Sequence, residues 1–451
     1  MRLLFTIQAI PARISIKRTC LFRAASQPNI TMATTTNFDV TQTSYLFNWI
    51  SNASSLQKGS SQQLADYVYC ALYGSTNEHP NPFSDKTPPG LIPTLGSQLR
   101  GTDWQLSWGP GVYEIDPESG KADNTAYVVY SQSEDTYIIA IAGTDPHAFL
   151  DWLKEDFQVG PNDCVDWTPS IPTGARPTGI QADSTKEQIS LGTALGIWAL
   201  GSQLTLSQYA PTTDYPRLAD YLQNLKPKSN QSTLLFTGHS LGGALSPTLA
   251  RWAKENTQFS NILAMPTAGP TPGNNAYQKA WDTQFQSTLL NDINPGNLVN
   301  KLNRNVWNLQ DVVPHAWQYI FTKNVQSSVP PSQQYYFSNA STDLIKLKLV
   351  SQIGDLIPGT LFRSIASGRQ NVADQAGMTR PKYTTPFSSS WPTFYYDKDD
   401  NVASLEQSTG PYYPDDDDVF LATLGLIHVW GYGSAAFGLD FSIFIQLHPK
   451  N

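Results

Sequence analysis

The chain has 451 residues, 40% hydrophobic and 15% charged, which suits one large globular domain or two of ordinary size. Its net charge of −8 argues against a nucleic-acid-binding protein, because phosphate contacts require a basic surface. No stretch approaches about twenty consecutive apolar residues, which argues against a membrane-spanning helix.

The chain contains three cysteines, Cys20, Cys70 and Cys164. They are too few for a disulfide framework, and no CxxC pair indicates zinc. This favours a reducing compartment, although a single bridge between Cys70 and Cys164 stays open as an alternative. The aspartate run at 415–418 is more typical of a solvated loop than of a calcium site. The sequence thus predicts no metal and no cofactor.

The first 31 residues differ in composition from the rest, because they carry arginines and no acidic residue. Such a segment is typical of an organellar transit peptide. The alternative is an upstream extension, with Met32 instead of Met1 as the working start. A secretory signal is less favoured, since Thr6 and Gln8 interrupt the short apolar run. The location therefore stays open between the cytoplasm and an organelle.

Apolar residues recur at helical spacing over 38–73, and a Pro/Gly-rich loop follows at 86–96. Strand-like runs then alternate with helical patterns. The predicted strands are 126–131, 137–143, 232–238, 261–269 and 306–311, and the predicted helices are 184–203 and the stretch after Ser240. This alternation predicts an α/β fold whose sheet is covered by helices on both faces. Residues 320–415 lose the rhythm and are interpreted as an insertion, with an amphipathic stretch at 341–357.

The sequence Gly238-His239-Ser240-Leu241-Gly242 has the GxSxG pattern, with a strand before it and an amphipathic helix after it. A nucleophilic serine needs a sharp turn from strand to helix, and the glycines permit the close approach of backbone that this turn requires. The turn also leaves the amide of Leu241 at a helix N-terminus, where it can donate to an oxyanion. Pro247 is expected to kink or shorten the helix.

The stretch GHSLGGALS resembles the class 3 (fungal-type) triacylglycerol lipases, a branch of the α/β-hydrolases. Three further stretches, 141–157, 267–282 and 308–317, are similar to the oxyanion segment, the GxPxxGN element and the NxxDxVPH element of that family, in the same order. The resemblance covers roughly residues 125 to 320, plus a short C-terminal piece. It implies a mixed, mostly parallel central sheet, a lid helix, and an inserted region before a C-terminal histidine loop.

The resemblance implies that Asp311 orients the catalytic base, and its place after a strand agrees with that role. Asp292 is the second candidate for the acid. Since the base follows the acid in this fold, the histidine is expected after residue 311. His315 is four residues from Asp311 and His448 is close to the chain end, which leaves His428 as the predicted base.

Thr144 and Leu241 are the predicted oxyanion donors. The segment from Pro146 to Phe157 has an apolar face typical of a lid helix that turns toward lipid, although a permanently packed helix is the alternative. The lid and substrate-binding residues proposed on this face are Phe149, Leu150, Trp152 and Leu153.

The resulting hypothesis is a serine ester hydrolase acting on acylglycerols at an oil or membrane interface, with a Ser240-Asp311-His428 triad. A phospholipase A1, galactolipase or small-ester esterase is the close alternative, and a non-catalytic lipid-binding or scaffold protein is the alternative from another class. The expected organisation is an extension at 1–31 and a single domain at 32–451. Within that domain we expect a helical part at 38–120, a hydrolase core at 121–320, the insertion at 320–415 and the histidine segment at 416–451.

Overall fold

The described part of the computed structural model begins at Asn37. The described residues are 37–83, 87–143, 162–211, 214–295, 297, 299–307, 384–386, 394–396, 402–404, 428 and 432–447.

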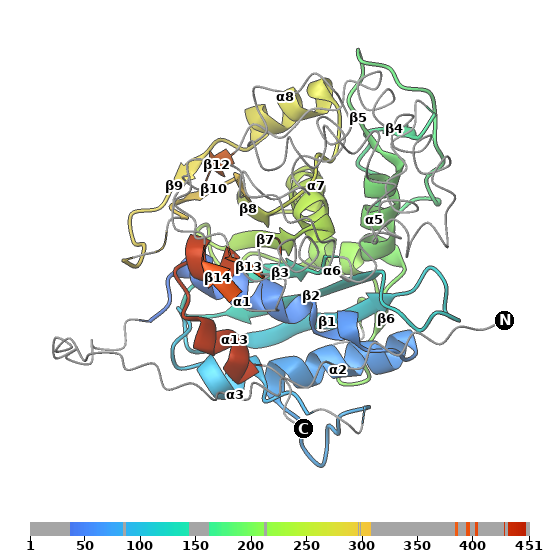
Figure 1. Cartoon of the computed structure of the whole chain (residues 1–451). Coiled ribbons are helices and arrows are strands. Elements are labelled where there is room, and N and C mark those ends of the chain that lie inside the picture. The colour runs from blue at the N-terminus through green and yellow to red at the C-terminus, as the bar shows by residue number, and fades with distance from the viewer. Residues whose placement is uncertain are drawn as a thin grey trace. The chain divides into compact units, whose positions relative to one another are not determined.

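An eight-stranded sheet forms the centre of this unit (Figure 1). Its strands are β1 (Gln105–Tyr113), β2 (Asn124–Ser131), β3 (Thr136–Ile141), β6 (Thr205–Leu206), β7 (Thr233–His239), β8 (Asn261–Thr267), β11 (Asn305–Trp307) and β12 (Thr384–Pro386). Their order across the sheet is β12-β11-β8-β7-β3-β2-β1-β6. Neighbours are parallel from β12 to β3 and antiparallel from β3 to β6. The sheet is therefore mixed and mostly parallel, as predicted.

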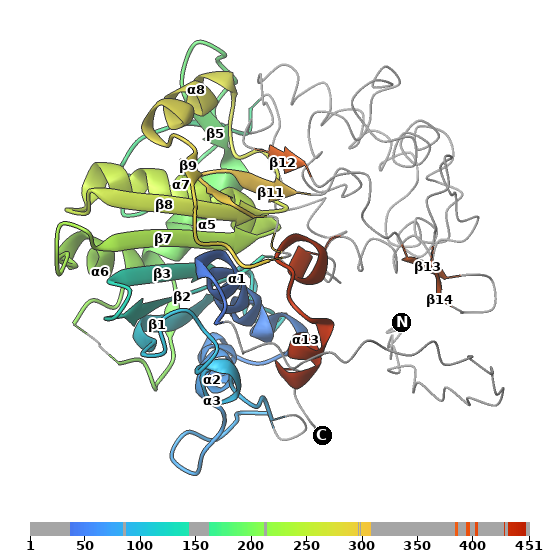
Figure 2. The ribbon, with the colours of Figure 1, turned by 90° about the vertical axis from the view of Figure 1, so that its left-hand side faces the viewer.

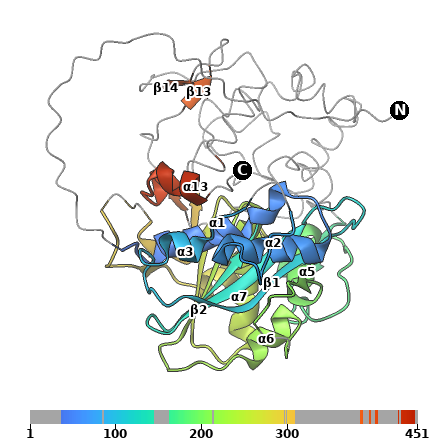
Figure 3. The same ribbon diagram turned by 90° about the horizontal axis from the view of Figure 1, so that it is seen from below.

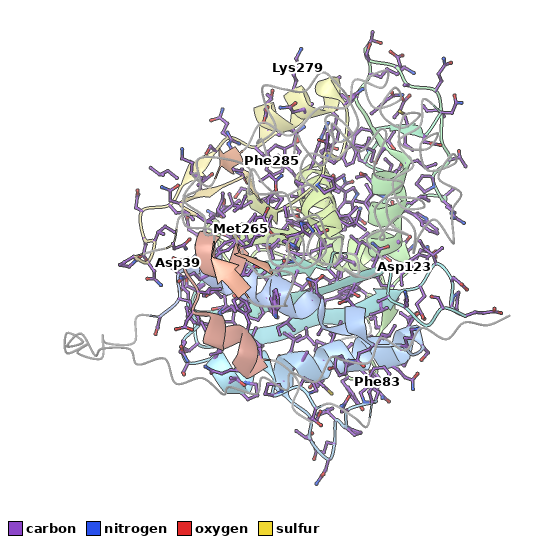
Figure 4. The ribbon with its side chains drawn as sticks, viewed as in Figure 1. Asp39, Phe83, Asp123, Met265, Lys279 and Phe285 are labelled. Carbon is purple, nitrogen blue, oxygen red and sulfur yellow. The ribbon has the colours of Figure 1, made fainter. Side chains whose placement is uncertain are left out.

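Helices cover both faces of the sheet (Figure 3). On one face lie α1 (Val40–Ser51), α2 (Ser61–Tyr73), α3 (Leu91–Leu95) and α13 (Phe441–Leu447), and on the other lie α5 (Leu191–Ser202), α6 (Leu218–Asn224), α7 (Leu241–Asn256) and α8 (Asn275–Gln284). Successive strand residues point to opposite faces, so Ile139 packs on the α7 side while Ile138 packs on the α1 side. Met265 and Phe285, labelled in Figure 4, likewise belong to the two separate apolar clusters.

Smaller elements complete the described part of the chain. They are the 3-10 turn η1 (Ala53–Leu56), the π-helical turn η5 (Tyr432–Ala436), and three two-stranded ribbons: β4 (Cys164–Asp166) with β5 (Gln188–Ser190), β9 (Thr288–Leu289) with β10 (Lys301–Leu302), and β13 (Phe394–Tyr396) with β14 (Val402–Ser404).

Strand β1 was missed by the sequence analysis because Gly109-Pro110-Gly111 has the composition of a turn. The tripeptide fits into the strand because the register with β2 shifts between Leu106 and Gly111. The loop predicted at 86–96 contains the short helix α3. The helix predicted over 184–203 begins only at Leu191, after the capping Ser190, because residues 188–190 pair with β4.

The packing decides one open alternative and corrects one expectation in part. Cys70 and Cys164 are both buried, and no disulfide joins them. Helix α7 is not shortened at Pro247 but continues through it to Asn256. The bond that proline removes would have ended on the carbonyl of Gly243, four residues earlier. That carbonyl oxygen instead faces Gly269 after β8.

We expect Gly243→Ala to destabilise the fold. Alanine gains about 1 kcal/mol of helix propensity over glycine. However, a Cβ at this position would lie 2.6 Å from Gly269 Cα and 2.6 Å from the Thr267 carbonyl oxygen, which are backbone atoms that cannot rotate away. Overpacking of this kind costs about 1–3 kcal/mol. Urea unfolding should therefore give a lower free energy of unfolding.

The matched control is Gly59→Ala, because a Cβ there would meet only the side chains of Phe83 and Gln63. Its loss of stability should be smaller. Equal losses in the two variants would show that the backbone contact at Gly243 is not the constraint.

Candidate active site

The candidate site lies at the carboxyl ends of the parallel strands, which meet at one edge of the sheet. The register sets Ile141 of β3 beside Gly238 of β7, and His239 of β7 beside Thr267 of β8. Ser240 follows β7 directly and precedes the first residue of α7. The serine is thus fixed at the edge of the sheet where an α/β fold places its ligands.

The backbone of Ser240 has φ 59° and ψ −124°, a conformation that residues other than glycine rarely adopt. Two backbone hydrogen bonds hold it: the Ser240 N–H donates to the Thr267 carbonyl at 3.0 Å, and the Gly243 N–H donates to the Ser240 carbonyl at 2.8 Å. The neighbouring strand and helix therefore impose the sharp turn that the GxSxG pattern predicts.

The two glycines of the pattern are needed for different contacts. A Cβ on Gly238 would lie 2.0 Å from the carbonyl oxygen of Gly242, and a Cβ on Gly242 would lie 2.5 Å from the carbonyl oxygen of Ile141. Both contacts are with backbone, so no side-chain movement could relieve them. Gly238 lets α7 fold back on β7, and Gly242 lets α7 approach the end of β3.

The structure brings His428 to Ser240 across 188 residues of chain. Its Nε2 lies 2.9 Å from Ser240 Oγ, within hydrogen-bonding distance. Both residues are buried, each with 6% of its surface exposed. Low exposure strengthens the interaction because little water competes for either group. A serine hydroxyl beside an imidazole nitrogen at this distance can transfer its proton during nucleophilic attack.

His239 packs beside this pair without replacing His428 in it. Its ring centroid lies 4.8 Å from that of His428 and 5.3 Å from that of Tyr432. Nδ1 of His239 lies 3.2 Å from Thr267 Oγ1, and the threonine hydroxyl donates to the Gly238 carbonyl at 3.2 Å. Since that hydroxyl proton is committed to Gly238, the threonine oxygen accepts from the His239 Nδ1–H. His239 thus supports the wall of the site.

Several predicted site residues lie outside the described residues: Asp311, Thr144, His315, His448, and the lid residues Phe149, Leu150, Trp152 and Leu153. Strand β11 ends at Trp307, four residues before Asp311, and lies parallel to β8. Asn305 in this strand donates to the Gly269 carbonyl at 3.0 Å, which ties β11 to the loop after β8. Leu241, the other predicted oxyanion donor, is the first residue of α7.

Asp292, the second candidate for the acid, is an exposed residue. Its carboxylate accepts from Arg100 Nη1 at 2.6 Å, and 87% of its side-chain surface is open to solvent. A carboxylate in a solvent-facing ion pair cannot orient the buried His428. The residues that the structure describes contain no cluster of three or more His, Cys, Asp or Glu suited to a metal ion. Nor does any helix among them have the length and apolar character needed to cross a membrane.

The sequence of residues 203–319 matches the family described as Lipase (class 3). This segment contains β7, the turn at Ser240, α7, β8 and β11. The match covers 117 of the 451 residues and shows that this segment is similar to the class 3 lipases. The match supports a carboxylic ester hydrolase. No curated protein matches the chain in sequence.

The fold is similar to that of M37 lipase, with a TM-score of 0.53 and 20% sequence identity over 91% of this chain and 98% of that chain. The triacylglyceride lipase of Rhizomucor miehei is more distant in structure. It has a TM-score of 0.34 and 14% identity over 62% of this chain and 75% of that chain, too low to add to the assignment. The similarity to M37 lipase confirms the α/β-hydrolase architecture.

We expect Ser240→Gly to unfold at higher urea concentration than Ser240→Ala. Alanine keeps the Cβ that makes φ 59° unfavourable, whereas glycine adopts positive φ freely. Strain at such a position costs about 1–3 kcal/mol of stability. Glycine costs about 0.5–1 kcal/mol of stability, because it loses more conformational freedom on folding than alanine does. The net gain in the free energy of unfolding should be about 1 kcal/mol. A glycine variant no more stable than the alanine variant would rule out strain at this turn.

Proposed function

We propose that this chain is a triacylglycerol lipase that cleaves long-chain acylglycerols through an acyl-enzyme on Ser240. His428 is the general base, Asp311 orients it, and the amides of Thr144 and Leu241 hold the oxyanion. The observation that carries the proposal is the 2.9 Å distance between Ser240 Oγ and His428 Nε2 at the edge of the sheet.

In the proposed reaction, His428 Nε2 takes the Ser240 hydroxyl proton as Oγ attacks the ester carbonyl carbon. The carbonyl oxygen becomes an oxyanion, which accepts hydrogen bonds from Leu241 and Thr144. Because the first amides of a helix have no intrahelical acceptor, Leu241 at the start of α7 is suited to this role. His428 then returns the proton to the departing glycerol oxygen. Water, activated by the same histidine, releases the fatty acid and regenerates Ser240.

Reaction with a fluorophosphonate probe tests the nucleophile and its base. We expect the probe to label the wild type but not Ser240→Ala, and His428→Ala to lower kcat by about 10⁴-fold or more, as loss of a triad member does. His448→Ala is the control and should leave turnover unchanged. Loss of activity on replacing His448 but not His428 would reverse the assignment of the base. A wild type that the probe does not label would favour the non-catalytic scaffold alternative.

Substrate class is tested with triacylglycerol emulsions, phospholipid, galactolipid and a soluble short-chain ester. We expect emulsified triacylglycerol to be preferred. Replacing Trp152 of the proposed lid with serine should lower the rate on the emulsion by about tenfold, because one large apolar side chain contributes about 1.5–3 kcal/mol when buried in lipid. The rate on the soluble ester should hardly change. Preference for phospholipid or galactolipid would identify the close alternative, and activity restricted to the soluble ester would identify an esterase.

A further inference from the structure

Helix α1 lies outside the part of the chain that matches the class 3 lipases, yet it contacts two segments of the candidate site. The match begins at residue 203, whereas α1 spans Val40–Ser51. The helix packs over β3 and β7 on one side and against the C-terminal segment on the other (Figure 2). Ten of its twelve residues are buried, including polar ones such as Asn48. A helix with a buried polar face requires partners for that face.

Asn52, at the C-terminal end of α1, holds the backbone where the chain leaves β3. Its Oδ1 accepts a hydrogen bond of 2.8 Å from the N–H of Gly143. One turn earlier, the Nδ2 of Asn48 donates to the Ile141 carbonyl at 2.9 Å. Two asparagines on one helix therefore fix two peptide groups in a row at the end of this strand.

The peptide held by Asn52 packs directly against the nucleophile. A Cβ on Gly143 would lie 2.5 Å from the His239 carbonyl oxygen and 3.0 Å from Ser240 Cβ. Gly143 is also the residue before Thr144, the proposed oxyanion donor. A change in the path of the chain at Gly143 would therefore move backbone that packs against Ser240.

The other end of α1 is tied to the segment that carries His428. Gln42 Nε2 donates to the Phe437 carbonyl at 2.7 Å, and the Tyr45 ring stacks on the Phe437 ring with centroids 4.3 Å apart. Asp39 caps the start of the helix by accepting from the Thr41 and Gln42 amides (Figure 4). One rigid helix thus connects the end of β3 with the histidine segment, and its position sets the distance between them.

We propose that Asn52 is a positioning residue for ester hydrolysis, which holds the strand end at Gly143 in the geometry that receives the oxyanion opposite Ser240. The inference rests on the proposed function, because it gives the segment after β3 the role of oxyanion donor. Asn52 acts through the Gly143 peptide and does not itself touch the substrate.

A purely structural role is the competing explanation, since Asn52 Nδ2 also donates to the Asn48 carbonyl at 2.9 Å, as residues at helix ends often do. Asn256 makes the same local bond at the end of α7, to the Trp252 carbonyl at 2.8 Å. Asn256 belongs to the last turn of α7, whereas Ser240 precedes its first. Asn256→Ala is therefore a matched control for loss of the helix-terminal bond.

The experiment compares kcat and KM on a soluble nitrophenyl ester, and the rate of fluorophosphonate labelling, for the wild type and three variants. We expect Asn52→Ala to lower kcat and the labelling rate by about 10–100-fold with KM nearly unchanged, because a displaced oxyanion site weakens binding of the transition state more than of the substrate. Asn256→Ala should lower Tm about as much as Asn52→Ala does, and it should keep full kcat.

Asn52→Asp separates the two roles of Asn52. The carboxylate keeps an acceptor for the Gly143 N–H, but it loses the donor to Asn48 and places a negative charge at a helix C-terminus, where it is unfavourable. We expect kcat close to that of the wild type and a lower Tm.

The following outcomes decide whether the inference holds. If kcat in Asn52→Asp and Asn52→Ala falls in proportion to Tm, or if Asn52→Ala keeps full kcat in an active enzyme, the inference is wrong while the proposed function stands. If Asn52→Ala is too unstable to assay, the kcat of Asn52→Asp decides. A folded Asn52→Asp with low kcat refutes the inference, and one with kcat close to that of the wild type supports it. A wild type that neither hydrolyses esters nor reacts with the probe refutes the proposed function and the inference together.

Discussion

The proposed chemistry of this protein depends on the hydrogen-bonding distance between Ser240 Oγ and His428 Nε2, which joins residues 188 positions apart. Each partner is useful only if its own segment is held rigidly. The serine is held by the sharp turn between β7 and α7, and the histidine by a segment that packs on the opposite side of the sheet from α7. The fold therefore brings these two segments into contact and buries the serine and the histidine.

Close approach of backbone to backbone makes the serine side of the pair rigid. Gly238, Gly242 and Gly143 each lie where a Cβ would collide with a main-chain oxygen. Such contacts leave no room for a side chain to rotate, so the position of Ser240 relative to β3 is tightly fixed. The unfavourable φ of Ser240 is retained because the surrounding hydrogen bonds overdetermine it.

The histidine side is organised differently, through a helix from the other end of the chain. Helix α1 shares an apolar cluster with α13 and η5, and its polar side chains reach both the end of β3 and the carbonyl of Phe437. The N-terminal helices therefore contribute to the geometry of the site, although the match to the class 3 lipases does not include them.

The sequence by itself determined the elements whose signal is local. Alternating strands and helices predicted the α/β sheet, the glycine spacing around Ser240 predicted the turn, and chain order selected His428 from the histidines after residue 311. Strand β1 escaped prediction because Gly109-Pro110-Gly111 has the composition of a turn, and only pairing with β2 makes it a strand. Only the tertiary structure decided that Cys70 and Cys164 form no disulfide, that Asp292 is exposed and that Asn52 accepts from the Gly143 N–H. Each of these features depends on which residues far apart in the sequence become neighbours, and local sequence patterns do not predict such contacts.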